Sequence, residues 1–91
     1  MQVEYQRLFK KKFRKLNPKI KQAFYKRLEL FSINKFDPIL NNHPLQGKYL
    51  GCYSFNVTGD YRVIFTELKN GDKEHVVILF DIDTHSGLYG R

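Results

Sequence analysis

The amino-acid sequence predicts an α+β domain in which an N-terminal helical hairpin packs on a small antiparallel β-sheet. The chain has 91 residues, a length that suits one core, so we expect a single domain over residues 1–91. Hydrophobic residues make up 42% and aromatic residues 15% of the sequence, which excludes a disordered chain. Apolar residues recur at a helical period before residue 34 and at a period of two after Gly47.

The N-terminal part predicts a short strand, at residues 3–5, and then two amphipathic helices. Asn17-Pro18 separates the helices, because Asn is a good N-cap and Pro suits a first helical turn. We expect the second helix to end near Asn34, and the short connection predicts a helical hairpin. The apolar stripes lie at Leu8, Phe9, Phe13 and Leu16 in the first helix and at Ile20, Ala23, Phe24, Leu28 and Phe31 in the second.

The C-terminal part predicts a loop and a three-stranded meander. Residues 35–48 contain two prolines and a glycine and are expected to form the loop. Strands are expected at 49–57, 61–68 and 75–82, with turns at Thr58-Gly59 and Asn70-Gly71. The last strand contains the run VVILF, which is typical of a strand covered on both sides. The order is therefore (β)ααβββ, and the polar side of the first two meander strands should face outward and carry any site.

Charge is distributed unevenly along the chain. The net charge is +7, and residues 1–35 hold eleven Lys and Arg against two Glu, whereas residues 36–91 hold five against seven acids. A basic segment of this kind indicates a polyanion or an acidic protein as partner, although lysines that solvate outer helix faces would give the same pattern. We expect neither a membrane span nor a secretory signal. The lone Cys52 excludes an internal disulfide, and a cytoplasmic protein fits best.

Five polar residues near strand ends or on the open face are candidates for chemistry. They are His43, Asp60, Arg62, His85 and Tyr89. No metal-ligand spacing and no nucleotide-binding motif occurs, so we expect no cofactor and no metal. Taken singly, each residue has an ordinary interpretation as a surface, turn or packing residue.

Together with the basic segment, these residue types fit cleavage of RNA by its own 2′-hydroxyl group. That reaction needs a base, an acid and a cation for the negative charge of the phosphorane oxygens. Imidazole can serve in either proton-transfer role because its pKa lies near neutral pH, at about 6.5. Guanidinium matches phosphate oxygens, and a tyrosine ring can stack on an unpaired base.

Three segments resemble the RelE/ParE superfamily of bacterial toxins, and most closely its YafQ-like members. The segments are HPLQG (43–47), GCYSFNVTGDYRVIF (51–65) and DTHSGLYG (83–90). The resemblance implies a RelE-like fold and the toxin of a type II toxin–antitoxin system. It further implies a metal-independent, ribosome-dependent mRNA endonuclease that a cognate antitoxin silences. The ribosome, mRNA and the antitoxin would be its partners.

The resemblance also assigns site residues. His43, Asp60, His85 and Tyr89 match active-site positions of YafQ-like toxins, and Arg62 is similar to an arginine of RelE-type toxins. We expect His85 to be the general acid and Asp60 or His43 to be the general base, with Asp60 slightly preferred if Arg62 does not neutralise it. Arg62 would hold the scissile phosphate and Tyr89 would stack on a base.

Two further residues are expected to contact substrate, and the function keeps two alternatives. Lys48 would assist at the phosphate, and Asn56 stands where many YafQ-like toxins have a histidine, so it would hydrogen-bond a phosphate or a ribose without carrying protons. One alternative is a ParE-like inhibitor of DNA gyrase that cleaves no RNA. The other is a degenerate toxin that survives as a binding module.

Overall fold

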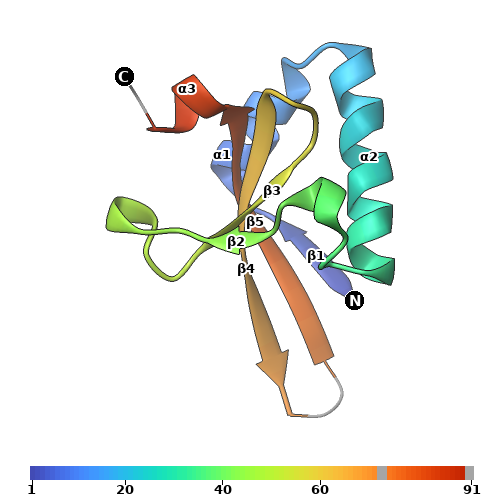
Figure 1. Cartoon of the computed structure of the whole chain (residues 1–91), viewed down its shortest axis with the longest axis vertical. Coiled ribbons are helices and arrows are strands. Elements are labelled where there is room, and N and C mark those ends of the chain that lie inside the picture. Colours follow the sequence, from blue (N-terminus) through green and yellow to red (C-terminus); the bar gives the residue numbers. More distant parts are fainter. Residues whose placement is uncertain (72–73, 90–91) are drawn as a thin grey trace.

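A computed structural model describes residues 1–71 and 74–89 and shows a short strand, two helices and then the other four strands of a five-stranded sheet (Figure 1). The long elements are β1 (Gln2–Tyr5), α1 (Arg7–Arg14), α2 (Pro18–Ile33), β3 (Tyr53–Asn56), β4 (Tyr61–Asn70) and β5 (Glu74–Thr84). The short elements are η1 (Pro38–Leu40) and η2 (Gly47–Tyr49), which are 3-10 helices, β2 (His43–Pro44) and α3 (His85–Tyr89). In the described residues, no helix is long and apolar enough to cross a bilayer.

The predicted start and end of the second helix are confirmed. The Asn17 side chain accepts a hydrogen bond from the backbone N–H of Ile20 at 3.0 Å, and Pro18 occupies the first turn. The helix ends at Asn34, whose backbone N–H donates to Leu30. Both helices are present because each has an apolar face to bury, and only three residues separate α1 from α2.

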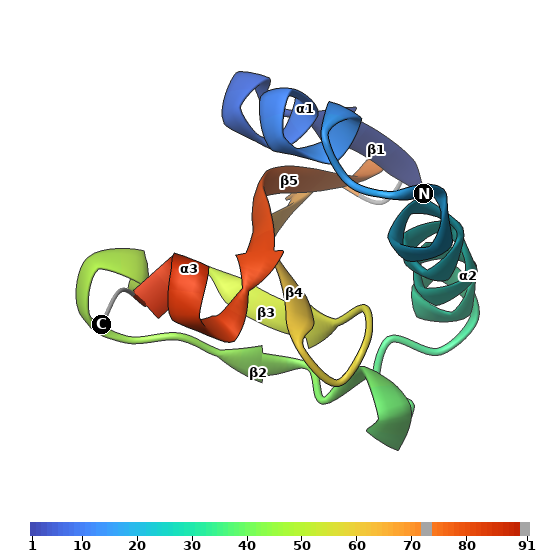
Figure 2. The same ribbon diagram turned by 90° about the horizontal axis from the view of Figure 1, so that it is seen from above.

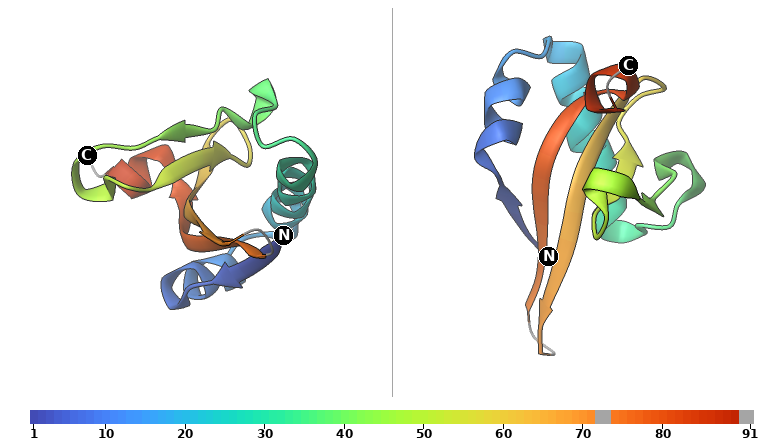
Figure 3. Two further views of the ribbon diagram at one scale, coloured as in Figure 1. Left: turned by 90° about the horizontal axis from the view of Figure 1, so that it is seen from below. Right: turned by 90° about the vertical axis from the view of Figure 1, so that its left-hand side faces the viewer.

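The sheet is mixed, whereas the sequence predicted an antiparallel one. Its strand order is β1-β5-β4-β3-β2, in which β1 is parallel to β5 and the remaining pairs are antiparallel. Helices α1 and α2 lead the chain away from the edge of the sheet at which β1 lies. The meander then occupies the rest of the sheet, so that its last strand, β5, lies beside β1. In Figure 3, right, β1 lies alongside β5, and the β4–β5 hairpin extends beyond the rest of the sheet.

The main core lies between the helices and one face of the sheet. Helix α1 covers β5, and Figure 2 shows both helices on this side. Phe31 of α2 packs against Phe55 of β3 and Phe65 of β4, with ring centroids 5.4 and 5.1 Å apart. The prediction that the aromatic sides of these strands meet the helices is therefore confirmed. The buried members of this core are Phe9, Phe24, Phe31, Leu40, Phe55, Val57, Val63, Phe65, Val77, Leu79 and Ile82.

The opposite face of the sheet is partly covered, which the prediction of an open polar face did not include. Leu45, Ile64 and Leu88 form a second, smaller core there. Leu45 comes from the segment that was expected to be loop, and that segment pairs with β3 through the two-residue strand β2. The predicted strand at 49–57 is shorter, Tyr53–Asn56, because residues 47–49 form η2 and Gly51 has a left-handed backbone (φ 93°).

Candidate active site

A hollow of about 360 Å³ lies on the second face, beside the smaller core. It is formed by the segment around β2, the start of β4 and the short helix α3, which lie far apart in the sequence. Four of the five predicted catalytic residues line it, and the fifth, Asp60, does not. The lining residues are Asn41, His43, Pro44, Leu45, Gln46, Arg62, His85 and Tyr89.

The backbone fixes how His43 presents its imidazole. Its Nδ1 lies 2.7 Å from the carbonyl oxygen of Asn41, so Nδ1 carries the proton and donates it in this contact. Asn41 has a left-handed backbone (φ 48°), which asparagine tolerates and which ends η1. In the neutral imidazole Nε2 is then an acceptor, so His43 is arranged to take a proton.

The Arg62 guanidinium is held by Asn56, its cross-strand neighbour. Arg62 Nη1 donates to Asn56 Oδ1 at 2.6 Å, and the two residues pair directly between β3 and β4. The main-chain oxygen of Asn56 accepts a hydrogen bond from Arg27 Nη1 at 3.4 Å. Asn56 was predicted to contact substrate, and in the structure its side-chain oxygen holds the Arg62 guanidinium.

Helix α3 carries His85 and Tyr89 one turn apart, so both rings face the hollow. Their centroids lie 4.7 Å apart. The backbone N–H of His85 donates to the Asp60 carbonyl, and the Tyr49 hydroxyl donates to the Leu88 carbonyl at 3.2 Å. Two anchors from distant segments therefore hold a helix of only five residues.

Two predicted residues lie outside the hollow. Asp60 precedes β4 in an exposed turn, and its main-chain carbonyl rather than its carboxylate supports the site through His85. The Lys48 ammonium lies over the Tyr49 ring, 5.1 Å from the centroid. Neither side chain is among those that line the hollow.

Lys12 of α1 forms ion pairs with the two carboxylates that precede His85. Its Nζ lies 2.9 Å from Asp81 Oδ1 and 3.1 Å from Asp83 Oδ2. Burial of the ammonium lowers the pKa of Lys12, but its hydrogen bonds to Asp81 and Asp83 outweigh this and raise it above the ordinary value. Lys12 therefore contacts both carboxylates of the strand that leads to His85.

The hollow is therefore suited to an anion. It contains one guanidinium and two imidazoles, and the described residues that line it include no carboxylate. Three side chains of the kinds that bind metals gather nowhere in residues 1–71 and 74–89. A phosphate group is an anion that such a constellation can bind and transfer protons around.

Sequence reasoning missed Asn41, Gln46 and Lys12. The Asn41-Asn42 pair before a proline was a signal of a left-handed turn, but nothing in the run of lysines singled out Lys12. Only the structure explains why residue 87 is glycine, and the explanation is steric. A Cβ atom there would lie 2.5 Å from Asp83 Oδ1, so only glycine lets α3 lie this close to β5.

Comparison with solved structures identifies the fold. YafQ from E. coli matches with a TM-score of 0.64 and 25% identity, over 97% of each chain. The YoeB/ParE toxin from Agrobacterium tumefaciens matches with a TM-score of 0.76 and 14% identity, over 93% of this chain and 99% of that one. The chain has the fold of the RelE/ParE superfamily of toxins.

This RelE/ParE fold confirms the resemblance read from the three motif segments. E. coli YafQ in complex with DinJ also matches, with a TM-score of 0.62 and 25% identity over 97% of each chain. No family model matches the sequence, and no curated protein does. The likeness therefore rests on three-dimensional structure together with the three short motif segments, each of which contributes to the lining of the hollow.

Proposed function

We propose that this protein is the toxin of a type II toxin–antitoxin pair and cleaves mRNA on the ribosome. The observation that supports the proposal most is the convergence of His43, Arg62 and His85 on one hollow from three distant segments. Two groups able to transfer protons and one fixed cation are the set that cleavage by a 2′-hydroxyl requires. A protein that only inhibits a partner by binding has no need of this set.

In the proposed reaction, the 2′-oxygen of a ribose attacks the adjacent phosphorus atom. His43 Nε2 takes the proton from the 2′-hydroxyl, and His85 gives a proton to the 5′-oxygen as the phosphorus–oxygen bond breaks. Arg62 binds the phosphate oxygens, whose negative charge grows in the transition state. The products are a 2′,3′-cyclic phosphate and a 5′-hydroxyl, and no metal takes part in any step.

His43 is a better candidate for the base than Asp60. The contact with the Asn41 carbonyl leaves Nε2 of His43 free as an acceptor inside the hollow. Asp60 lies in an exposed turn, and its carboxylate does not line the hollow. Proton transfer requires hydrogen-bond reach to the attacking group, which favours the histidine.

The proposal also assigns a role to Tyr89 and a protein partner, the antitoxin. The Tyr89 ring lines the hollow beside His85 and is 38% exposed, so it can stack on a base next to the scissile phosphate. E. coli YafQ is seen in complex with DinJ, and we expect a cognate antitoxin here also. Ribosome-dependent cleavage places the protein in the cytoplasm.

The test distinguishes mRNA from DNA gyrase as the target of this protein. Purified protein is added to a translating extract, and the 5′ ends of the mRNA are mapped; in parallel, DNA gyrase supercoiling is measured. We expect cut mRNA only when ribosomes are present and unchanged supercoiling. Intact mRNA with blocked supercoiling would replace the proposal with a gyrase inhibitor, and no effect in either assay would indicate a binding module.

A further inference from the structure

A second hollow lies on the other side of the β3–β4 turn from the candidate active site. It is a groove of about 530 Å³ between α2 and the turn. Its helix side is one face of α2, since the residues recur at intervals of three and four. We call it the α2 groove, and it is lined by Lys19, Gln22, Ala23, Lys26, Arg27, Val57, Thr58 and Gly59.

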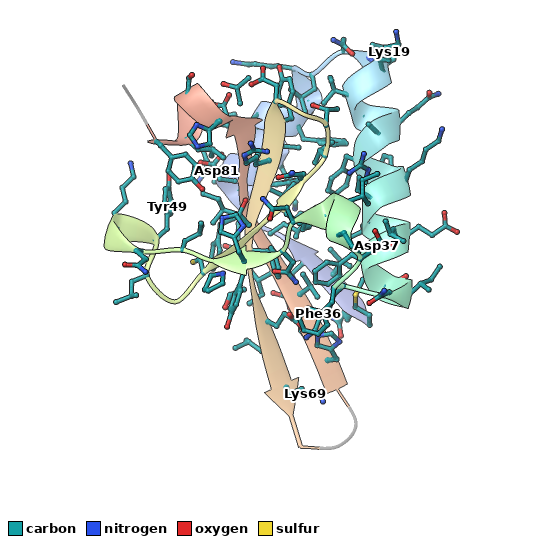
Figure 4. The ribbon with its side chains drawn as sticks, viewed as in Figure 1. Lys19, Phe36, Asp37, Tyr49, Lys69 and Asp81 are labelled. Atoms are coloured by element: carbon teal, nitrogen blue, oxygen red, sulfur yellow. The ribbon has the colours of Figure 1, made fainter. Side chains whose placement is uncertain are left out.

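The positive charge in the α2 groove is not neutralised. Lys19 and Lys26 form no ion pair with any described carboxylate, and none lines the groove. Arg27 Nη1 donates to the carbonyls of Ile39 and Asn56, which leave its charge intact. Lys19 lies in the first turn of α2, which contains no acidic residue, so the helix dipole adds to the positive potential (Figure 4).

The same short turn connects the α2 groove to the candidate active site. Residues 57–59 line the groove, and the next residue, Asp60, accepts the hydrogen bond of the His85 backbone. The main-chain oxygen of Asn56 accepts a hydrogen bond from Arg27, and its side-chain oxygen accepts one from Arg62. Figures 1 and 2 show the turn between α2 and α3, at the end of the molecule where α2 begins.

The geometry points to the α2 groove as a binding site for the sugar–phosphate backbone of single-stranded RNA that extends beyond the scissile linkage. This inference rests on the proposed function, because the active-site hollow must bind the phosphate that is cut. The strand would cross the β3–β4 turn and place its next phosphates near Lys19 and Lys26.

The lining favours RNA over an acidic protein. Protein interfaces use aromatic or large apolar side chains as anchors, and the α2 groove has none that is exposed. Val57 is 1% exposed, and Ala23 and Gly59 are small. Exposed apolar side chains such as Tyr25 and Phe36 lie outside the groove. Backbone phosphates need only cations and polar groups.

The test compares a double variant of the groove, Lys19→Gln/Lys26→Gln, with a control, Lys11→Gln/Lys15→Gln. The control also removes two exposed lysines, from α1 and the residue after it. The probe is a labelled single-stranded RNA of about twelve nucleotides, methylated at every 2′-oxygen so that it cannot be cut. Fluorescence anisotropy gives its dissociation constant over a range of salt concentrations.

We expect the groove variant to weaken RNA binding about tenfold near physiological salt and the control to change it less than about twofold. The slope of log affinity against log salt should fall by about 1.4 in the groove variant, since each single-strand phosphate contributes about 0.7. A methylated dinucleotide is too short to reach both hollows, so the wild type and the groove variant should bind it equally.

Equal RNA binding by the groove variant and the control would overturn the inference, as would a wild type that binds no RNA at any salt. A glutamate peptide of similar length that binds as tightly as RNA would also overturn it and assign the groove to an acidic protein. The proposed function can fail separately. A wild type that binds the RNA through Lys19 and Lys26 but cuts no mRNA on ribosomes would support the α2 groove as an RNA-binding site and contradict the proposed nuclease activity.

Discussion

The two faces of the sheet bury cores of different origin. The helix face is filled by phenylalanines from α1, α2, β3 and β4, and Phe24 contacts the rings of both Phe9 and Phe13. The other face has the small core of Leu45, Ile64 and Leu88, which come from the segment after β2, from β4 and from α3. We therefore expect the first core to supply most of the stability of the fold and the second to hold the side chains of the candidate site together.

The second core explains how a helix of five residues can carry two site residues. So short a helix does not form alone in water. Leu88 is 2% exposed in the small core, the Tyr49 hydroxyl binds its carbonyl, and Thr84 Oγ1 accepts from the Gly87 N–H. His85 and Tyr89 therefore keep their places only while these contacts persist.

We expect the largest effect on stability from a substitution in the main core, and a smaller one from a substitution in the second core. Phe24→Ala leaves a cavity in the main core and should lower the free energy of unfolding by about 3–5 kcal/mol. Leu88→Ala should cost about 2 kcal/mol or less globally, because α3 can detach while the main core stays intact. Urea denaturation measures the first change, and hydrogen exchange should show loss of protection in α3. Equal global losses would contradict the division between the cores.

The next effect tests which group is the base. His43→Gln should reduce mRNA cleavage about 10²-fold or more, because a positioned general base contributes about that factor. Asp60→Asn should change cleavage less than about threefold, since it keeps the backbone carbonyl that supports His85. Cleavage rates of folded variants, checked by circular dichroism, decide between them. A large loss in Asp60→Asn with little in His43→Gln would reverse the assignment.

A smaller effect concerns Lys12, which links the main-core helix α1 to the strand that leads into α3. Lys12→Met leaves the buried carboxylate of Asp81 without its cation and should cost about 2 kcal/mol in the free energy of unfolding. Lys11→Met, the exposed neighbour, is the matched control and should cost less than about 0.5 kcal/mol.

The pH dependence of this pair follows from the raised pKa of Lys12. A folded-state pKa above the unfolded value gives a contribution that is complete below the unfolded pKa and is lost as pH rises through the folded one. The stability difference between wild type and Lys12→Met should therefore persist at neutral pH and shrink in strongly alkaline solution. A difference that grows with rising pH would contradict this assignment.

The smallest effect tests the close approach of α3 to β5. In Gly87→Ala the new Cβ would overlap the Asp83 carboxylate, so either Asp83 leaves Lys12 or α3 moves. We expect a loss of about 1 kcal/mol in the free energy of unfolding and about a tenfold loss of cleavage. Ser86→Ala, an exposed change on the same helix, should leave both unchanged. Full activity in Gly87→Ala would show that the position of α3 is not critical.

The sequence predicted the elements whose signals are local. The Asn17 cap, the apolar stripes of both helices and the two-residue period of the strands each act within a few neighbours. The parallel pairing of β1 with β5 could not be predicted in this way, since it depends on which sheet edge the two helices leave free. The strand β2 was missed because its two residues pair only with a distant partner.

The site was predicted as a set of residues rather than as a geometry. His43, Arg62, His85 and Tyr89 line one hollow, although only Arg62 was expected within a strand. The place of Asp60 was less predictable, because whether a turn residue directs its carboxylate or its carbonyl to the site depends on the turn itself. The bond from Asn56 to Arg62 needs the exact register of β3 and β4.

The chemistry of the cut ends tests the central claim most directly. Wild-type protein is added to translating ribosomes, and the termini of the cut mRNA are identified by enzymatic end-labelling. Attack by the 2′-hydroxyl with His43 as base and His85 as acid predicts a 2′,3′-cyclic phosphate and a 5′-hydroxyl. A 3′-hydroxyl and a 5′-phosphate would mean that water is the nucleophile, and the account would be contradicted.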